Sequence, residues 1–175
     1  MKNNIGIIYA TVDGQTLKIC NKIKEELETT NNTVQLISIE DFDQDLNQFD
    51  KLVIGSSIRY GVHHKKIIDF INSNKQVLES IKTAFISVNL VARKEEKNTH
   101  LTNPYVIKFF KTINWNPSLI GVFAGKLDYK KYPFFDRIMI QFIMWITKGP
   151  TNTDAEIEYT NWDKVNEFGK SINSM

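Results

Sequence analysis

A short apolar run, residues 5–10, is the feature that most constrains what this chain can fold into. The run is continuous rather than alternating, as expected of a parallel strand that is covered on both faces. It stops at a polar stretch that contains Gly14, and from Gln15 onward apolar residues recur at helical spacing. Strand, polar loop and helix therefore follow one another directly, which predicts the start of a parallel α/β sheet.

The same alternation returns along the rest of the chain. Further strands are predicted at residues 33–39, 52–57, 83–88 and 119–124, and further helices at residues 64–78, 104–113 and 162–172. Pro104 suits the first turn of its helix, and Asn161 suits the N-cap of the last one. With right-handed crossovers, the pattern predicts a single α/β domain over residues 1–175, with a doubly wound five-stranded parallel sheet.

Composition excludes several classes of function. The 22 basic and 20 acidic side chains are mixed along the chain, so no nucleic-acid arm is expected. Cys20 is the only cysteine and falls in the first predicted helix, which indicates a core residue and a reducing compartment. His63, His64 and His100 lack metal-ligand spacing, so we expect no metal and interpret them as solvated or capping residues. The first apolar run is too short for a signal peptide, and none is long enough to span a bilayer.

Three loops follow predicted strands and should meet at one edge of the sheet. The first loop, Thr11 to Thr16, offers backbone amides at a helix N-terminus and two threonine hydroxyls, which suit a phosphate. It matches neither G-x-x-x-x-G-K-[ST] nor G-x-G-x-x-G, so a monophosphate is the expected ligand. The alternative is that Asp13 simply caps the helix and the threonines are turn residues. The second loop is a predicted turn from Ser56 to Gly61, and the third runs from Ser87 to Lys94.

The pattern T-x-x-G-x-T in the first loop resembles the FMN-phosphate loop of flavodoxins, and the other two loops correspond to those that bracket the isoalloxazine ring. All three stretches resemble one flavodoxin branch, the menaquinone-dependent protoporphyrinogen IX dehydrogenases. The likeness continues through Lys97, Tyr105, Asp136 and Gly149 and covers essentially the whole chain. Asp13 stands where electron-carrier flavodoxins usually have threonine, which agrees with the dehydrogenase branch.

The resemblance implies a flavodoxin-like fold with strand order 2-1-3-4-5. It also implies FMN chemistry: oxidation of protoporphyrinogen IX in heme biosynthesis, with a quinone (menaquinone or ubiquinone) as acceptor and no assigned catalytic side chain. The cofactor-binding residues that it implies are Thr11, Val12, Asp13, Gly14, Gln15, Thr16, Ser56, Ser57, Ile58, Arg59, Tyr60, Gly61, Ser87, Val88, Asn89, Leu90, Val91, Ala92 and Arg93. Arg59, Arg93, Lys94, Tyr129 and Tyr132 are the expected contacts of the substrate, since a guanidinium can fork to a propionate. Lys94 can equally be a solvated loop charge.

An insertion, residues 126–149, follows the fifth predicted strand. It is rich in aromatic and aliphatic side chains and carries five basic residues against two acidic ones. This composition predicts an amphipathic helix in a membrane interface. Together with the resemblance, it implies a peripheral protein at the cytoplasmic face of a bacterial inner membrane. The alternative is buried core or the interface of a homo-oligomer. In the family that the chain resembles, the insertion distinguishes dehydrogenases from carriers and is expected to contribute to the substrate site.

Two other classes of function stay open at this stage. One is a flavodoxin-like electron carrier or an NAD(P)H-quinone reductase, and the other is a flavin-free interaction domain that keeps only the fold. Electron carriers of this fold are usually strongly acidic, whereas this sequence has a pI near 8.5. The charge therefore favours the dehydrogenase over the carrier.

Overall fold

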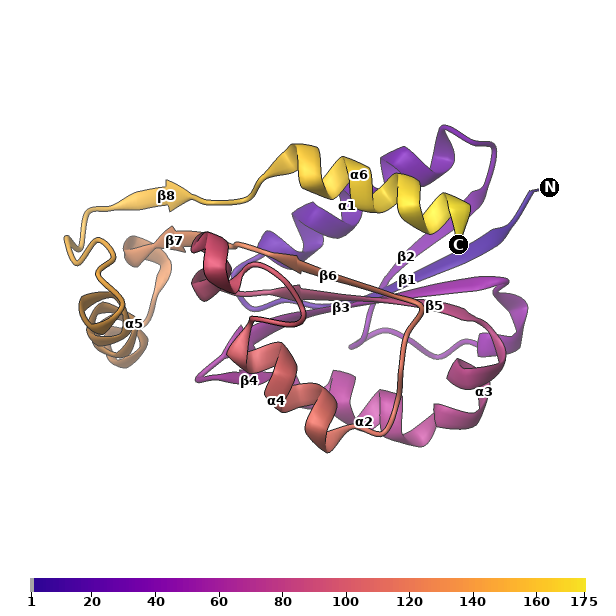
Figure 1. Cartoon of the computed structure of the whole chain (residues 1–175), viewed down its shortest axis with the longest axis horizontal. Coiled ribbons are helices and arrows are strands. Elements are labelled where there is room, and N and C mark those ends of the chain that lie inside the picture. The colour runs from indigo at the N-terminus through magenta and orange to yellow at the C-terminus, as the bar shows by residue number, and fades with distance from the viewer. Residues whose placement is uncertain (1) are drawn as a thin grey trace.

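The computed structural model describes residues 2–175. Its centre is a parallel sheet in the order β2-β1-β3-β5-β6, with a short strand β4 paired antiparallel to the end of β3 (Figure 1). β5 and β6 are the fourth and fifth parallel strands, so the predicted order 2-1-3-4-5 is confirmed. The strands are β1 (Asn4–Ala10), β2 (Thr33–Ser38), β3 (Lys51–Arg59), β4 (Val62–His63), β5 (Lys82–Val88) and β6 (Leu119–Phe123).

Helices cover both faces of this sheet. α1 (Gln15–Glu28) and α6 (Trp162–Ser174) lie on one face, and α2 (Lys65–Ser73), α3 (Lys75–Ser80) and α4 (Pro104–Thr112) lie on the other (Figure 1). The Asn161 side chain caps α6 by accepting from the Lys164 amide, and Pro104 occupies the first turn of α4, both as predicted. Short 3-10 turns complete the chain at Leu46–Gln48, Leu90–Arg93 (η2), Glu95–Lys97 and Tyr129–Lys131.

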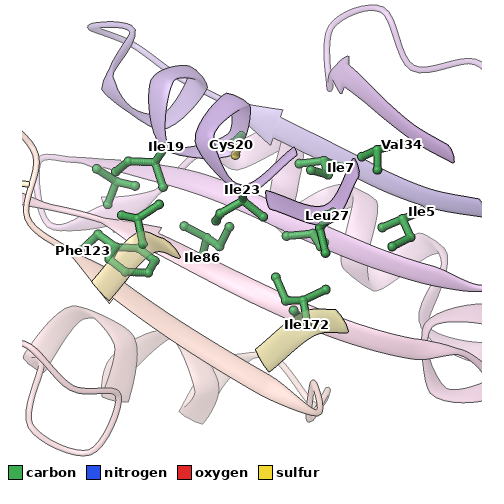
Figure 2. Close-up of a cluster of buried hydrophobic side chains, with 14 residues drawn as sticks. Ile5, Ile7, Ile19, Cys20, Ile23, Leu27, Val34, Ile86, Phe123 and Ile172 are labelled. Carbon is green, nitrogen blue, oxygen red and sulfur yellow. The ribbon is translucent and has the colours of Figure 1, made fainter. Parts of the chain in front are cut away.

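The core forms two layers, one on each face of the sheet. Ile7 and Ile86 from the sheet meet Ile23 from α1 on the first face (Figure 2). Ile54 and Phe85 pack against the helices of the second face. Both faces of the central strands are thus buried, which is why these strands read as continuous apolar runs. Cys20 lies in the first layer, where burial raises the pKa of its thiol to about 12, so its predicted core role is confirmed.

Two predicted boundaries were wrong. The single helix expected at residues 64–78 is divided into α2 and α3 at Asn74, whose φ of −116° leaves the helical region and whose side-chain amide donates to the Phe70 carbonyl at 2.9 Å. The turn expected at residues 56–61 is confined to Tyr60 and Gly61, with φ of 51° and 78°. The residues before them continue β3, because β4 folds back to pair with Ile58 and Arg59.

The insertion is a folded excursion beyond the carboxyl ends of the strands (Figure 1). It leaves β6 as β7 (Lys126–Asp128), forms α5 (Phe134–Ile146), and returns as β8 (Glu156–Glu158), which pairs antiparallel with β7. It therefore continues about nine residues past the predicted end at Gly149. Within residues 2–175, no helix is long and apolar enough to cross a membrane.

Candidate flavin site

A cleft of about 840 Å³, counted to its open mouth, lies at the carboxyl edge of the sheet. Segments of all three predicted loops form its walls, and the inner side of α5 forms its roof through Met139, Ile140 and Ile143. The predicted convergence of the three loops is confirmed.

The first loop has the geometry of an anion site. Gly14 takes a left-handed conformation, with φ of +85°, at the N-cap of α1, and its amide donates to the Thr11 hydroxyl at 3.0 Å. The amides of the first helical turn beyond it have no partner within the helix, as in every helix. The Thr16 hydroxyl is buried and has no hydrogen-bond partner among residues 2–175. A phosphate placed here would satisfy both the amides and this hydroxyl.

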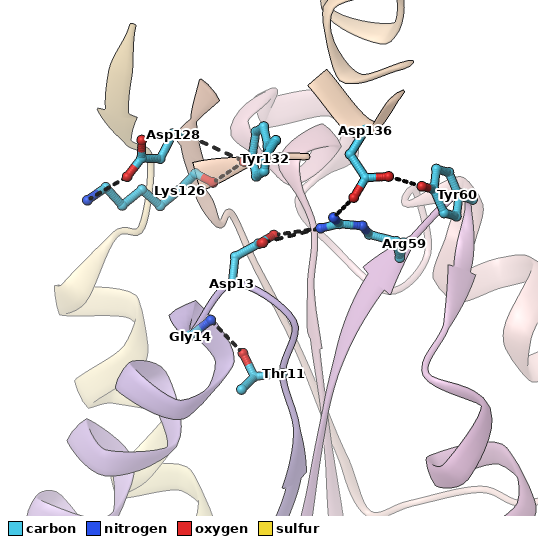
Figure 3. Close-up of polar contacts among 9 residues, drawn as sticks. All are labelled: Thr11, Asp13, Gly14, Arg59, Tyr60, Lys126, Asp128, Tyr132 and Asp136. Carbon is cyan, nitrogen blue, oxygen red and sulfur yellow. Dashed lines mark hydrogen bonds and ion pairs between the residues drawn. The ribbon is translucent and has the colours of Figure 1, made fainter. Parts of the chain in front are cut away.

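Asp13 does not cap α1, so that part of the alternative is wrong, whereas Thr11 does act as a turn residue by accepting a hydrogen bond from the Gly14 amide. Its carboxylate accepts hydrogen bonds from the Arg59 guanidinium at 3.0 and 3.2 Å (Figure 3). The second Nη of Arg59 donates to Asp136 of α5, whose other carboxylate oxygen accepts from the Tyr60 hydroxyl. Arg59 also lies over the ring of Tyr132, 5.8 Å from its centroid. One guanidinium thus joins the phosphate loop to the insertion.

Burial by itself lowers the pKa of the Arg59 guanidinium, but the hydrogen bonds and charges of Asp136 and Asp13 outweigh it and the pKa is raised. Arg59 is therefore charged at every pH at which the protein is folded. Two carboxylates around one guanidinium leave this group with one net negative charge. Because the charge of Arg59 is already compensated, it attracts a further anion more strongly when one of the two carboxylates gives way.

The second and third loops follow the adjacent strands β3 and β5, and both line the cleft. Ser57 of β3 has a buried hydroxyl with no hydrogen-bond partner within residues 2–175. Asn89 closes the other wall: its side-chain oxygen accepts from the Ala92 amide at 3.0 Å and from the Asn103 side chain at 3.1 Å. Tyr105 of α4 also lines the cleft. The sequence indicated Tyr105 only through the family likeness, because nothing in its local pattern places it at the carboxyl edge of the sheet.

His63 departs from its prediction as a solvated or capping residue. It is 3% exposed, and its ring packs against Phe109 with 4.4 Å between centroids. Its Nε2 lies 2.9 Å from the hydroxyl of Ser87, which also accepts from the Asn89 side chain at 3.3 Å. Burial lowers the pKa of His63 to about 3. The histidine therefore supports the wall of the cleft from behind as a neutral ring.

Most predicted cofactor residues line the cleft, and six do not. Those on its walls are Thr11, Asp13, Gln15, Thr16, Ser57, Ile58, Arg59, Tyr60, Gly61, Val88, Asn89, Leu90 and Val91. Those outside the lining are Val12, Gly14, Ser56, Ser87, Ala92 and Arg93. Some of the latter shape the loops instead, as Gly14 does through its backbone and Ser56 by accepting from the His64 amide at 3.1 Å.

The predicted substrate contacts divide in the same way. Arg59 and Tyr132 line the cleft, whereas Arg93, Lys94 and Tyr129 do not. The Arg93 guanidinium donates to the Thr147 hydroxyl at 2.7 Å, at the end of α5. Tyr129 is fully buried and donates to the Pro150 carbonyl at 2.8 Å. Both side chains hold the insertion in place, a role that the sequence pattern did not indicate.

These residues fit FMN. The unpartnered hydroxyl of Thr16 and the free amides of α1 suit a dianionic phosphate. The apolar roof and the loop segments Ser57–Gly61 and Val88–Val91 line one cleft, and this lining suits a flat aromatic ring. No lysine lies in the phosphate loop, which again favours a monophosphate over a triphosphate.

Comparison with known proteins agrees with this geometry. Residues 6–154 match the family model of the flavodoxin domain. The chain superposes on oxidised flavodoxin 2 from Bacillus cereus with a TM-score of 0.58, at 17% identity over 98% of each chain. It superposes on two-electron reduced Megasphaera elsdenii flavodoxin with a TM-score of 0.55, at 12% identity over 98% of this chain and 99% of that one. Fold and phosphate loop together define a protein of the flavodoxin class.

Two curated relatives narrow this class. The chain is 40% identical to a protoporphyrinogen IX dehydrogenase (quinone) of Leishmania major, over 97% of this chain and 74% of the relative. It is 38% identical to the protein of that name from Escherichia coli strain K12, over 95% of this chain and 92% of the relative. The chain belongs to the protoporphyrinogen IX dehydrogenase (quinone) family.

Proposed function

We propose that this protein binds FMN in the cleft and oxidises protoporphyrinogen IX to protoporphyrin IX, with a quinone as electron acceptor. The observation that carries the proposal is the combination of a flavodoxin phosphate loop with an apolar roof over the ring slot, in a chain whose relatives bear this name. A carrier that exchanges electrons with another protein needs an exposed flavin edge. The roof formed by α5 would cover that edge and suits small apolar reactants instead.

The chain's own residues would position the cofactor. The first turn of α1 and Thr16 hold the phosphate, and Asn89, fixed by Asn103, supports one side of the ring slot. Bound FMN supplies a two-electron acceptor that the quinone reoxidises, so a six-electron oxidation needs three rounds. Arg59 balances the charge of Asp13, which would otherwise repel the phosphate.

For the substrate, the apolar inner side of α5 would receive the macrocycle, and Arg59 with Tyr132 would receive a propionate. Arg93 and Tyr129 would position the insertion rather than contact the substrate, because the side chain of each donates a hydrogen bond to a residue of the insertion. Lys94 would contribute long-range attraction to the propionates. Each two-electron round removes one hydrogen together with the electron pair and one hydrogen as a proton, so three protons leave to water in all, since no side chain is assigned to accept them.

An anaerobic fluorescence assay tests the reaction. The purified protein, loaded with FMN, receives protoporphyrinogen IX with and without menadione, a soluble quinone. Quinone-dependent growth of porphyrin fluorescence is expected, over a no-protein control. Fluorescence that grows equally without quinone, or not at all, refutes the proposal. Rapid reduction of the flavin by NADH or NADPH in the same cuvette would favour an NAD(P)H-quinone reductase instead.

We further propose that the outer side of α5 docks on anionic lipid at the cytoplasmic face of the membrane. Large apolar side chains are exposed there, with Phe135 at 82% and Trp145 at 67%. Lys130, Lys131 and Lys148 stand exposed at the two ends of the helix, where they complement acidic headgroups. A membrane would also bring the enzyme to a lipid-dissolved quinone.

Liposome flotation tests this docking. Phe135→Asp with Trp145→Asp should abolish flotation with vesicles of phosphatidylglycerol and phosphatidylcholine. Leu101→Asp is the matched control, since Leu101 is 74% exposed but lies before α4. Equal flotation of all three proteins contradicts the docking. Dimers in the wild type that the double variant lacks, with no flotation of either, would identify α5 as an oligomer interface.

A further inference from the structure

Arg59 and Tyr60 form an anion site that is already filled by the protein itself. The guanidinium and the phenol converge on the carboxylate of Asp136, which comes from the first turn of α5 (Figure 3). The Asp136 side chain is only 13% exposed and that of Arg59 only 22%. All three residues line the cleft. A carboxylate of the same chain thus sits where the proposed function needs a carboxylate of the substrate.

The two ends of α5 are held in different ways. At its C-terminal end, Met144 is fully buried against Leu127 and the two tyrosines of the insertion, and Arg93 binds Thr147. At its N-terminal end, Phe134 and Phe135 face solvent, and Asp136 provides the polar contact to the sheet domain. An apolar anchor persists when an ion enters the cleft, whereas an ion pair can exchange partners. The N-terminal end is therefore the end that can be released.

Charge balance identifies which carboxylate yields. Asp13 lies in the phosphate loop, and without Arg59 its charge would face the bound phosphate. Replacing Asp136 by a carboxylate of the substrate leaves the charge around Arg59 unchanged, so the exchange costs little electrostatic energy. Replacing Asp13 would place two uncompensated anions side by side. Asp136 is thus the partner that Arg59 can give up.

We propose that Asp136 is an internal competitor for the carboxylate of the substrate: it latches α5 over the cleft through Arg59 and Tyr60 and is displaced when a propionate binds there. The inference rests on the proposed function, because it takes the substrate to be a porphyrinogen. It makes Asp136 a specificity-determining residue, since only a ligand with a carboxylate can replace it. Release of the N-terminal half of α5 would then accompany substrate entry.

Binding of two air-stable porphyrins to the FMN-loaded protein tests the inference. Protoporphyrin IX carries both propionates, whereas its dimethyl ester carries none, and both can be measured by fluorescence anisotropy in the same detergent. In Asp136→Asn, the affinity for protoporphyrin IX should rise about tenfold relative to that for the ester, because a propionate no longer competes with a carboxylate of the protein for Arg59 and Tyr60, whereas the ester forms no ion pair there. Asp154→Asn, the same change at an exposed site of the insertion, should leave this ratio unchanged.

Hydrogen exchange provides a second measurement that does not depend on a ligand. In Asp136→Asn, the amides of the N-terminal half of α5 should exchange faster, while those next to Thr147 keep their wild-type rates. Far-UV circular dichroism and FMN content check that the variant is folded and loaded.

Each other outcome overturns a defined statement. An unchanged or lowered preference for protoporphyrin IX in Asp136→Asn makes Asp136 a support for Arg59 rather than a competitor. Equal tightening of both porphyrins makes α5 a simple cover with no role for the carboxylate. A gain in Asp13→Asn but not in Asp136→Asn assigns the competition to Asp13. If the wild type binds neither porphyrin, the proposed function fails and this inference fails with it.

Discussion

Lowering the pH should destabilise this protein through His63, and the size of the effect follows from its burial. In the unfolded chain the imidazole titrates near its ordinary pKa of 6.5, whereas in the folded protein burial lowers its pKa to about 3. Between these two values the unfolded chain binds a proton that the folded protein excludes. The contribution of neutral His63 to the free energy of unfolding is therefore complete above about pH 6.5 and is lost progressively as the pH falls toward 3.

The magnitude at pH 5 can be worked out directly. At pH 5 the solution lies about 1.5 pH units below the pKa of the unfolded chain and still above that of the folded protein, and each unit corresponds to about 1.36 kcal/mol, so the loss is about 2 kcal/mol. His63→Gln cannot titrate, so the difference in its unfolding free energy between pH 8 and pH 5 should be about 2 kcal/mol smaller than that of the wild type. The variant starts from a lower stability at pH 8, because it loses packing against Phe85 and Phe109.

Urea unfolding with saturating FMN at pH 8 and pH 5 measures this difference. Contributions from the phosphate and from the carboxylates are common to both proteins and cancel in the comparison. His100→Gln, at an exposed position, is the matched control and should keep the wild-type pH dependence. If His63→Gln shows the same loss at pH 5 as the wild type, the histidine is not held neutral by burial and the reasoning is refuted.

Three other substitutions probe the loop and the insertion. Thr16→Val should lower the affinity for FMN about 10- to 100-fold in a fluorescence titration without lowering the stability of the FMN-free protein. Thr16→Ser should bind FMN as the wild type does. Equal affinity in the wild type and both variants would show that the hydroxyl does not contact the phosphate. Gly14→Ala should lower the free energy of unfolding in urea by about 1–2 kcal/mol, because a φ of +85° is strained for alanine although the added β-carbon would meet no other atom. Unchanged stability would contradict this conformation. Met144→Ala should speed hydrogen exchange throughout α5 while the amides of β1 stay protected. Simultaneous loss of protection in α5 and β1 would show that the insertion does not unfold separately.

Much of the site was predictable from the sequence because its signals are local. The apolar runs, the caps at Pro104 and Asn161 and the loop around Gly14 depend on residues within a few positions of one another. Parallel topology then brings the three loops to one edge, which is a general property of doubly wound sheets. The failures at Asn74 and at the start of the predicted turn after Ser56 are also local, where one side-chain hydrogen bond or a returning strand outweighs the apolar pattern.

The sequence by itself determined the fold class, the strand order and the family, and it predicted the loop that would hold a phosphate. Only the tertiary structure decided what the charged and titratable side chains do. Arg59 meets Asp13 across 46 residues and Asp136 across 77, and His63 is buried because β4 carries it under the cleft wall beside Ser87. The physical reason is range: backbone conformation and burial periodicity are set by neighbours in the chain, whereas the partner of a charge is set by where the folded elements place it.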